Sequence, residues 1–169
     1  MKKIIFFVSL LIIVSIGCEN DEIIIQPVPF SINVMATANP EGGMLECQMP
    51  EGDPVPLPKV SFTSGTATFL GTLDATKSTQ EILNCNFNMS TMALEGDIKV
   101  ILTGEDGDEL HFTGQAQYFM TGVGTGYLEV TNGTGKFEGA YGWIRTNGTT
   151  DPITGIATTT GEGMISPPR

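Results

Sequence analysis

The chain has 169 residues, 40% of them hydrophobic, and its 19 acidic residues outnumber 8 basic ones for a formal net charge of −11. This acidity argues against nucleic acid as a partner, because phosphate backbones bind clusters of lysine and arginine. About 150 residues follow an apolar amino-terminal segment, which is the size of one ordinary domain with one core.

The first segment is typical of an export signal. Lys2 and Lys3 precede an uncharged apolar run over residues 4–16, which ends at Gly17-Cys18. A helix needs about 20 apolar residues to cross a bilayer, so we expect residues 1–17 to be a cleaved signal peptide. Its removal leaves 6 basic against 19 acidic residues, a formal charge of −13.

The junction at Cys18 resembles the lipobox of bacterial lipoproteins. Ser15-Ile16-Gly17-Cys18 places small residues before a cysteine, although this chain has Ser15 where the family usually has leucine. The resemblance implies lipidation of Cys18, a tether over residues 18–29, and anchoring in the outer membrane on its periplasmic or cell-surface face. Two or three acyl chains make such attachment permanent. An ordinary signal peptide with a chance cysteine is the alternative.

The acidic residues at 19–22 resemble a surface-export signal or form a solvated tether.

Residues 30–58 begin with a predicted strand at 30–38 and continue as an irregular stretch at 39–58, which holds five prolines and three glycines. Proline fixes φ and lacks a ladder donor. Cys47 lies in this stretch and forms an even pair with Cys85 once Cys18 carries lipid. An oxidising compartment favours a disulfide between them, and two buried thiols are the alternative.

From residue 59 onward, short runs rich in valine, isoleucine, threonine and aromatic residues alternate with glycine-containing turns such as Asp106-Gly107. This pattern predicts antiparallel strands and an all-β fold. With the first strand the count reaches about eight, which is enough to close a single antiparallel barrel. A two-sheet β-sandwich has the same local signals and is the alternative. We expect residues 59–169 to form the barrel body, in one domain with 30–58. The predicted strands lie at 60–76, 82–89, 98–102, 108–120, 126–131, 137–146 and 153–165.

Three stretches resemble small secreted bacterial proteins related to the allene oxide cyclase and dirigent barrels. The first is Gly133-Thr-Gly-Lys-Phe-Glu-Gly-Ala-Tyr-Gly142, and the others are residues 64–71 and the turn from Gly107 to Leu110. The resemblance covers about residues 60–165. It implies an eight-stranded, calycin-like barrel. The family usually has histidine where this chain has Phe69, and no catalytic residue of the cyclases can be placed here.

Polar chemistry is sparse. His111 is the single histidine, and its same-parity neighbours are polar, so we expect it to face solvent. Four carboxylates around one glycine form a candidate site for a hard cation such as calcium, with a plain Asp-Gly hairpin as the alternative. No cofactor is expected. The four carboxylates belong to Glu105, Asp106, Asp108 and Glu109.

Several aromatic side chains share parity within predicted strands, so each set lies on one face of its strand. In a barrel the inward face either packs as core or lines a lumen that holds a small ligand. Arg145 continues this parity and is the one charged candidate for an inward position, but it stands at a strand end, where we expect it to face solvent at the rim. The candidate lining residues are Phe112, Tyr118, Phe137, Tyr141 and Trp143.

The sequence therefore favours a membrane-anchored binding or interaction module for a small apolar ligand or glycan. The alternatives are an enzyme of cyclase or isomerase type working in the lumen, and a purely structural surface protein. A charged residue on the inward face of an apolar strand would favour the enzyme.

Overall fold

The computed structural model describes residues 26–169. The predicted signal peptide, Cys18 and the tether up to residue 25 lie outside these described residues. Within residues 26–169, no helix has the length and apolar character needed to cross a membrane.

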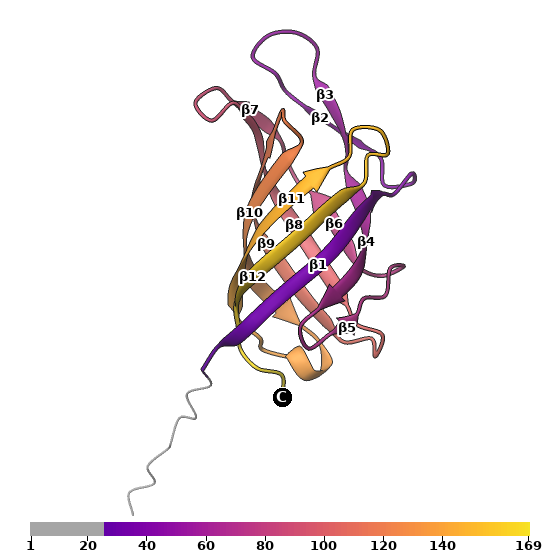
Figure 1. The fold of residues 1–169 in the computed structure, drawn as a ribbon, viewed down its shortest axis with the longest axis vertical. Coiled ribbons are helices and arrows are strands. Elements are labelled where there is room, and N and C mark those ends of the chain that lie inside the picture. The colour runs from indigo at the N-terminus through magenta and orange to yellow at the C-terminus, as the bar shows by residue number, and fades with distance from the viewer. Residues whose placement is uncertain (1–25) are drawn as a thin grey trace, which may run out of the picture.

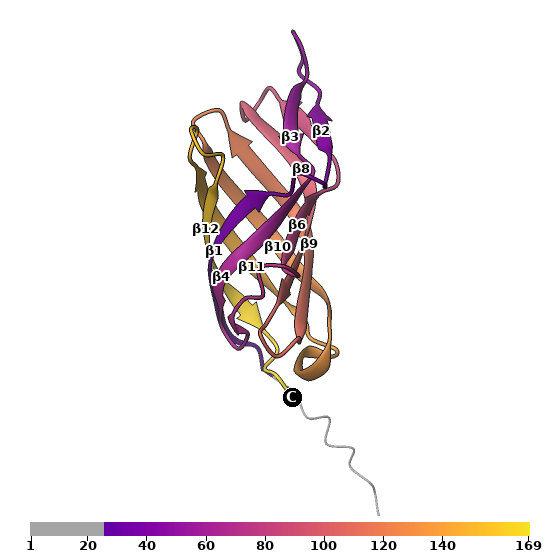
Figure 2. The ribbon, with the colours of Figure 1, turned by 90° about the vertical axis from the view of Figure 1, so that its right-hand side faces the viewer.

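Eight strands form a closed antiparallel barrel (Figures 1 and 2), in the order β1-β12-β11-β10-β9-β8-β6-β4 with β4 pairing back onto β1. Closure pairs every one of these strands on both sides, which removes the exposed edges that promote aggregation. The predicted barrel is confirmed, and the sandwich alternative is wrong. The strands are β1 (Val28–Ala38), β4 (Val60–Ala67), β6 (Thr79–Ile82), β8 (Ala93–Thr103), β9 (Glu109–Phe119), β10 (Val123–Gly133), β11 (Gly142–Thr150) and β12 (Ala157–Ile165).

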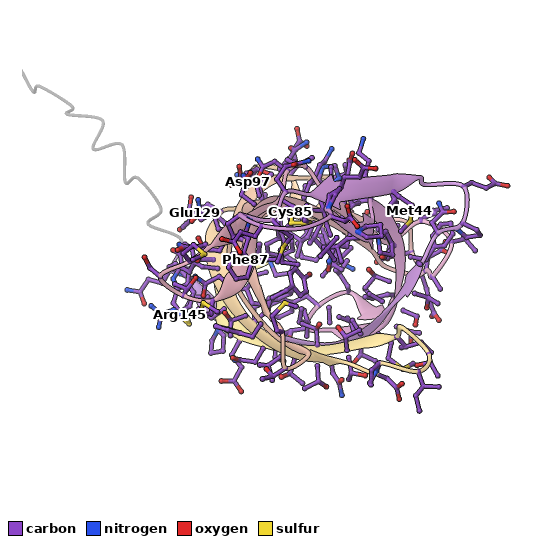
Figure 3. The ribbon with its side chains drawn as sticks, turned by 90° about the horizontal axis from the view of Figure 1, so that it is seen from above. Met44, Cys85, Phe87, Asp97, Glu129 and Arg145 are labelled. Carbon is purple, nitrogen blue, oxygen red and sulfur yellow. A yellow bond between two sulfur atoms is a disulfide. The ribbon has the colours of Figure 1, made fainter. Side chains whose placement is uncertain are left out.

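Alternation of side chains separates the lumen from the outer surface. In β1, Phe30, Ile32, Val34 and Ala36 are buried, while the residues between them are exposed. The same period holds in β8 and β9, where the sequence predicts it. In the view down the barrel (Figure 3), charged residues such as Arg145 project outside the ring.

The proline-rich stretch is more ordered than the sequence predicts. Residues 39–58 contain a two-stranded hairpin of β2 (Met44–Cys47) and β3 (Val55–Pro58), so the prediction of an irregular stretch is wrong. Pro56 and Pro58 fit in β3 because this strand pairs with β2 alone, and proline is tolerated where no ladder donor is needed.

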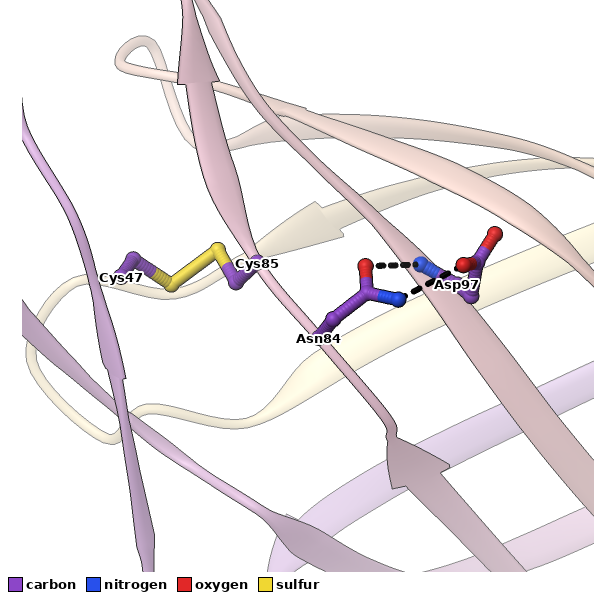
Figure 4. The surroundings of a disulfide bond; sticks show 4 residues. All are labelled: Cys47, Asn84, Cys85 and Asp97. Carbon is purple, nitrogen blue, oxygen red and sulfur yellow. Dashed lines mark hydrogen bonds between the residues drawn. A yellow bond between two sulfur atoms is a disulfide. The ribbon is translucent and has the colours of Figure 1, made fainter.

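The hairpin is bonded to the barrel through the predicted disulfide. Cys47 in β2 joins Cys85, which lies between β6 and the short strand β7 (Asn86–Asn88), with their Cα atoms 4.9 Å apart. Next to the bond (Figure 4), the Asn84 amide donates to the Asp97 carboxylate at 2.6 Å, and the Asp97 backbone N–H donates to Asn84 Oδ1 at 3.1 Å. The predicted disulfide is confirmed.

The single strand predicted at 82–89 is divided between β6 and β7, and Cys85 lies in the segment between them.

One end of the barrel is closed by the glycine-rich motif. Residues Gly135–Phe137 form a 3-10 helix, η1, and Phe137 is 1% exposed beneath the lumen. Phe30 and Phe112 fill the adjoining layer, with ring centroids 6.0 Å apart. The carboxyl terminus lies at this closed end too (Figure 1), where the Arg169 backbone N–H donates to the Lys136 carbonyl.

Candidate ligand-binding site in the barrel lumen

The half of the lumen farthest from η1 contains a cavity of about 60 Å³ that opens to solvent at the barrel end. The cavity exists because inward positions near this open end carry small side chains, whereas those near η1 carry phenylalanine, leucine and isoleucine. Closely packed interiors leave space only where such side chains are missing. The small inward residues are Ala36, Ala116, Gly124, Gly148 and Ala157.

Threonine hydroxyls make the wall of the cavity partly polar. Thr63 on β4 is 3% exposed, and its Oγ1 has no hydrogen-bond partner among residues 26–169. A buried hydroxyl without a partner costs roughly 1–3 kcal/mol. Its register partner on β1 is Ala36, so the free hydroxyl lies beside one of the small residues that create the cavity. The lumen thus contains an unused hydrogen-bonding group next to empty space. The other inward-facing threonines of the lining are Thr146, Thr150 and Thr159.

Tyr118 on β9 supplies a second polar group. Gln80 Nε2 on β6 donates to the Tyr118 hydroxyl at 3.1 Å, and burial raises the pKa of this phenol above its ordinary value of 10.0. The phenol is therefore neutral at physiological pH. Because its oxygen accepts from Gln80, its proton remains available for donation to a ligand.

The chemistry of this lining is neutral. Among residues 26–169, no aspartate, glutamate, histidine, cysteine, lysine or arginine lines the cavity, and Tyr118 is the one titratable side chain of the lining. Arg145 is exposed on the outer face of β11, as expected for a solvent-facing residue, so it does not enter the lumen. The arrangement can enclose apolar groups and form hydrogen bonds with one or two polar atoms.

The structure separates the five predicted lining aromatics. Phe112 packs in the filled part of the lumen, Tyr118 lines the cavity, and Phe137 lies in η1. Tyr141 is 46% exposed before β11 begins, and Trp143 lies outside, stacked on Tyr127.

The prediction that Phe137, Tyr141 and Trp143 share one strand face is wrong. The strand begins only at Gly142, and the chain before it passes through η1 and the left-handed region at Gly139, with φ of 73°. Strand parity is therefore lost between Phe137 and Trp143. Ile144, which is 1% exposed, takes the inward position in β11.

Three of the four carboxylates in the acidic turn contact basic side chains. Lys136 Nζ contacts both Asp106 and Asp108, and the hydrogen bond from Lys136 lowers the pKa of Asp106. Glu109 pairs with His111 at 2.7 Å, and Glu105 is exposed in the turn. In the part of the chain that the structure describes, no group of three or more His, Cys, Asp or Glu residues is placed to hold a metal ion. The turn at Asp106-Gly107 forms as predicted, with the Gly107 N–H donating to the Gly104 carbonyl.

Two features of the lumen are missing from the predictions made from the sequence. Thr63 and Gln80 provide hydrogen-bonding groups in the cavity, whereas the candidates predicted from the sequence are charged and aromatic residues. The run of inward alanine and glycine near one end is a usable signal, since small residues at lumen positions predict a cavity.

Phe69, at the position where the resembling family has histidine, is 40% exposed with φ of 67°, in the turn between β4 and β5 (Gly71–Thr72).

No protein-family model and no curated protein sequence matches the chain. Among solved structures, the fold is similar to the pterocarpan synthase dirigent protein PsPTS1, with a TM-score of 0.44 and 12% identity over 85% of this chain and 96% of that one. The pterocarpan synthase dirigent protein GePTS1 matches with a TM-score of 0.43 and 14% identity over 82% of this chain and 83% of that one.

Proposed function

We propose that this protein is a lipid-anchored binding module whose lumen takes a small, largely apolar ligand with one polar atom. The observation that carries the proposal is the buried Thr63 hydroxyl, which has no partner among the described residues and faces a cavity. A ligand oxygen at this position would satisfy the hydroxyl, and its apolar part would lie against Val34, Ile98 and Ala116.

The proposed anchor gives the barrel an orientation. β1 begins at Val28, at the closed end that contains η1 (Figure 1). A lipid on Cys18 would hold this closed end toward the outer membrane, so the open end would point away from it. In our proposal the ligand enters from the aqueous side, on the periplasmic or cell-surface face.

The rim of the open end supports an apolar ligand. Exposed apolar side chains lie in the segments that connect the strands at this end, where an entering ligand would contact them. Methionine is unbranched and polarizable, so it adapts to apolar partners of different shape. These rim residues are Met44, Met89, Met92, Met120 and Ile153.

The size of the cavity restricts the ligand. A space of about 60 Å³ compares with about 300–1,000 Å³ for pockets that enclose drug-sized molecules. The lumen therefore fits a slender group, such as the end of an alkyl chain with a hydroxyl. This geometry favours an apolar ligand over a glycan for the lumen.

Binding is favoured over the alternative enzyme of cyclase or isomerase type. General acid–base catalysis uses a titratable group near the working pH, and the one lining candidate is Tyr118, whose pKa burial raises. A purely structural surface protein would have no use for the cavity, so ligand binding separates it from our proposal.

The test uses full-length protein reconstituted in lipid nanodiscs and a series of n-alkanols from butanol to octanol. We expect hexanol to raise the Tm of the wild type and of Met35→Leu, an outward-facing control on β1 that is 50% exposed. Ala36→Leu fills the cavity and should abolish the shift, and Ala116→Leu repeats the test from β9. Equal responses in all four proteins, or none in any, would refute lumen binding.

A further inference from the structure

We propose a second binding site, on the outer wall of the barrel, that takes a neutral oligosaccharide. It consists of the stacked pair Tyr127 and Trp143 and the shallow groove beside them. The site does not depend on the lumen ligand, because Tyr127, Trp143 and Asn147 face the opposite side of the wall.

The aromatic pair lies on neighbouring strands. Tyr127 on β10 pairs in register with Arg145, and Trp143 on β11 pairs with Glu129, so the two aromatic rings meet diagonally. Their centroids are 6.1 Å apart with an interplanar angle of 21°, and Tyr127 is 43% exposed. Trp143 is half-buried, and because both rings lie on the outer face of the barrel they contribute nothing to the lumen core. Aromatic rings offer apolar surface to the C–H faces of pyranose rings, and they lose little entropy on binding.

The groove crosses the strands next to this pair. One hollow of about 360 Å³ lies over β9, β10 and β11, and another of about 720 Å³ lies over β11, β12 and β1. Arg145 and Asn147 line both hollows, so the two hollows are neighbours along the outer wall and together form the proposed groove. Figure 3 shows Arg145 and Glu129 on this outer side. Each hollow lies within the size range of small-molecule sites, about 300–1,000 Å³.

The polar groups of the groove match sugar hydroxyls. Gln115, Asn147 and Thr160 present amides and hydroxyls, which both donate and accept hydrogen bonds as sugar hydroxyls do. Arg145 Cζ lies 5.5 Å from the centroid of the Trp143 ring, and its guanidinium has no ion pair among residues 26–169. Its donors are thus free to bind ligand oxygens.

Charge determines which class of glycan fits. Glu129 and Glu162 flank the pair and the groove, and the proposed mature chain has a formal charge of −13. A polyanionic glycan would be repelled by this field, whereas a neutral one would not. A protein partner is disfavoured because its contact would need an apolar centre, and here amide and hydroxyl groups surround a single aromatic pair.

Trp143 is the single tryptophan of the chain, so its fluorescence reports directly on the groove. The experiment titrates full-length protein in non-ionic detergent with neutral polysaccharides (dextran, galactomannan, arabinoxylan and mixed-linkage β-glucan) and with polygalacturonate and alginate. Native gels containing each polysaccharide measure retardation in parallel. We expect at least one neutral polysaccharide to shift the emission and retard the protein.

Variants locate the binding. Trp143→Ala and Tyr127→Ala should weaken retardation about tenfold, equivalent to about 1.4 kcal/mol. Asn147→Ala should weaken it without touching an aromatic ring, which keeps the test valid if Trp143→Ala folds poorly. Phe69→Ala, an exposed aromatic at the closed end, and the lumen-filling Ala36→Leu should bind as the wild type does. Binding to none of the neutral polysaccharides, binding only to the two polyanions, or undiminished binding by Trp143→Ala and Asn147→Ala would overturn the proposal.

Discussion

Cys47 and Cys85 join two parts of the molecule that share few other bonds. The β2–β3 hairpin forms its own sheet outside the barrel, and its backbone meets β7 through the Gln48–Asn86 bridge, where the Phe87 N–H donates to the Gln48 carbonyl at 3.2 Å. The Cys47 side chain is fully buried at this junction. The disulfide is therefore the covalent tie that holds the hairpin against the rim.

Replacing both cysteines by serine should destabilise the protein. The bond closes a loop of 38 residues, for which the chain-entropy model gives roughly 4 kcal/mol. We expect guanidinium unfolding to show a loss of this order, and limited proteolysis to cut the double variant first within residues 48–54. Reduction of the wild type should reproduce both effects. An unchanged unfolding midpoint would mean that noncovalent contacts alone hold the hairpin.

Thr63→Val should stabilise the protein in the absence of ligand. Valine has nearly the shape of threonine and removes a buried hydroxyl that has no partner among the described residues, so we expect a gain of about 1 kcal/mol in the free energy of unfolding. Urea unfolding measures the change, and Thr66→Val, exposed on the same strand, is the control. A marked loss of stability in Thr63→Val alone would show that the hydroxyl is already satisfied.

The barrel and the disulfide could be predicted from the sequence because both follow from local rules. Alternation over β8 and β9 and the Asp106-Gly107 turn identify strands without knowledge of their partners. The cysteine pair follows from counting thiols in an exported chain. The two-residue β5 and four-residue β6 are too short to give a clear period, so their boundaries could not be predicted.

The candidate sites depend on features that the alternation of apolar and polar residues within one strand does not reveal. The Tyr127–Trp143 pair forms through the register between β10 and β11, which turn geometry sets. Alternation counted from Phe137 predicts the wrong face for Trp143, because Phe137 lies in η1 and the strand begins only at Gly142. The cavity depends on which inward positions are small along all eight strands together.

Tyr118 should make stability depend on alkaline pH. Burial raises its pKa in the folded state above 10.0, so the fold favours the neutral phenol. This contribution is fully present below pH 10.0, the unfolded pKa, and is lost as pH rises through the folded pKa. We expect urea unfolding between pH 8 and about 11.5 to show a steeper decline for the wild type than for Tyr118→Phe.

The comparison for Tyr118 needs a second tyrosine as a control, which separates the loss of this buried hydroxyl from the loss of any tyrosine hydroxyl. Tyr127 is exposed on the outer wall. Tyr127→Phe should therefore follow the wild-type curve. Parallel curves for Tyr118→Phe and the wild type would show that the phenol ionises as easily in the fold as in the unfolded chain.

The glycine at position 133 should be essential for closing the barrel. A Cβ added at Gly133 would lie 2.2 Å from the Phe137 carbonyl oxygen and 2.7 Å from the Phe137 Cβ. Neither atom can move without displacing η1, so an alanine there would expel the ring that fills the closed end. We expect Gly133→Ala to lower the free energy of unfolding by about 3 kcal/mol, similar to Phe137→Ala. Gly155→Ala, where φ is 69° and no atom lies within 4 Å of the added Cβ, should lose only about 1 kcal/mol for the left-handed backbone.

A double-mutant cycle by guanidinium unfolding separates this explanation from a general intolerance of alanine. If both single variants act by removing the Phe137 ring from its position, the combination of Gly133→Ala with Phe137→Ala should be little worse than either one, because the ring can be lost only once. A Phe137→Ala chain also retains the Phe137 Cβ and carbonyl, so a modest residual penalty from the close contact is expected. Gly155→Ala combined with Phe137→Ala should be additive, since the β11–β12 turn lies at the opposite end of the barrel from η1. Full additivity in the Gly133 cycle would mean that the glycine stabilises the barrel by some route other than the Phe137 plug.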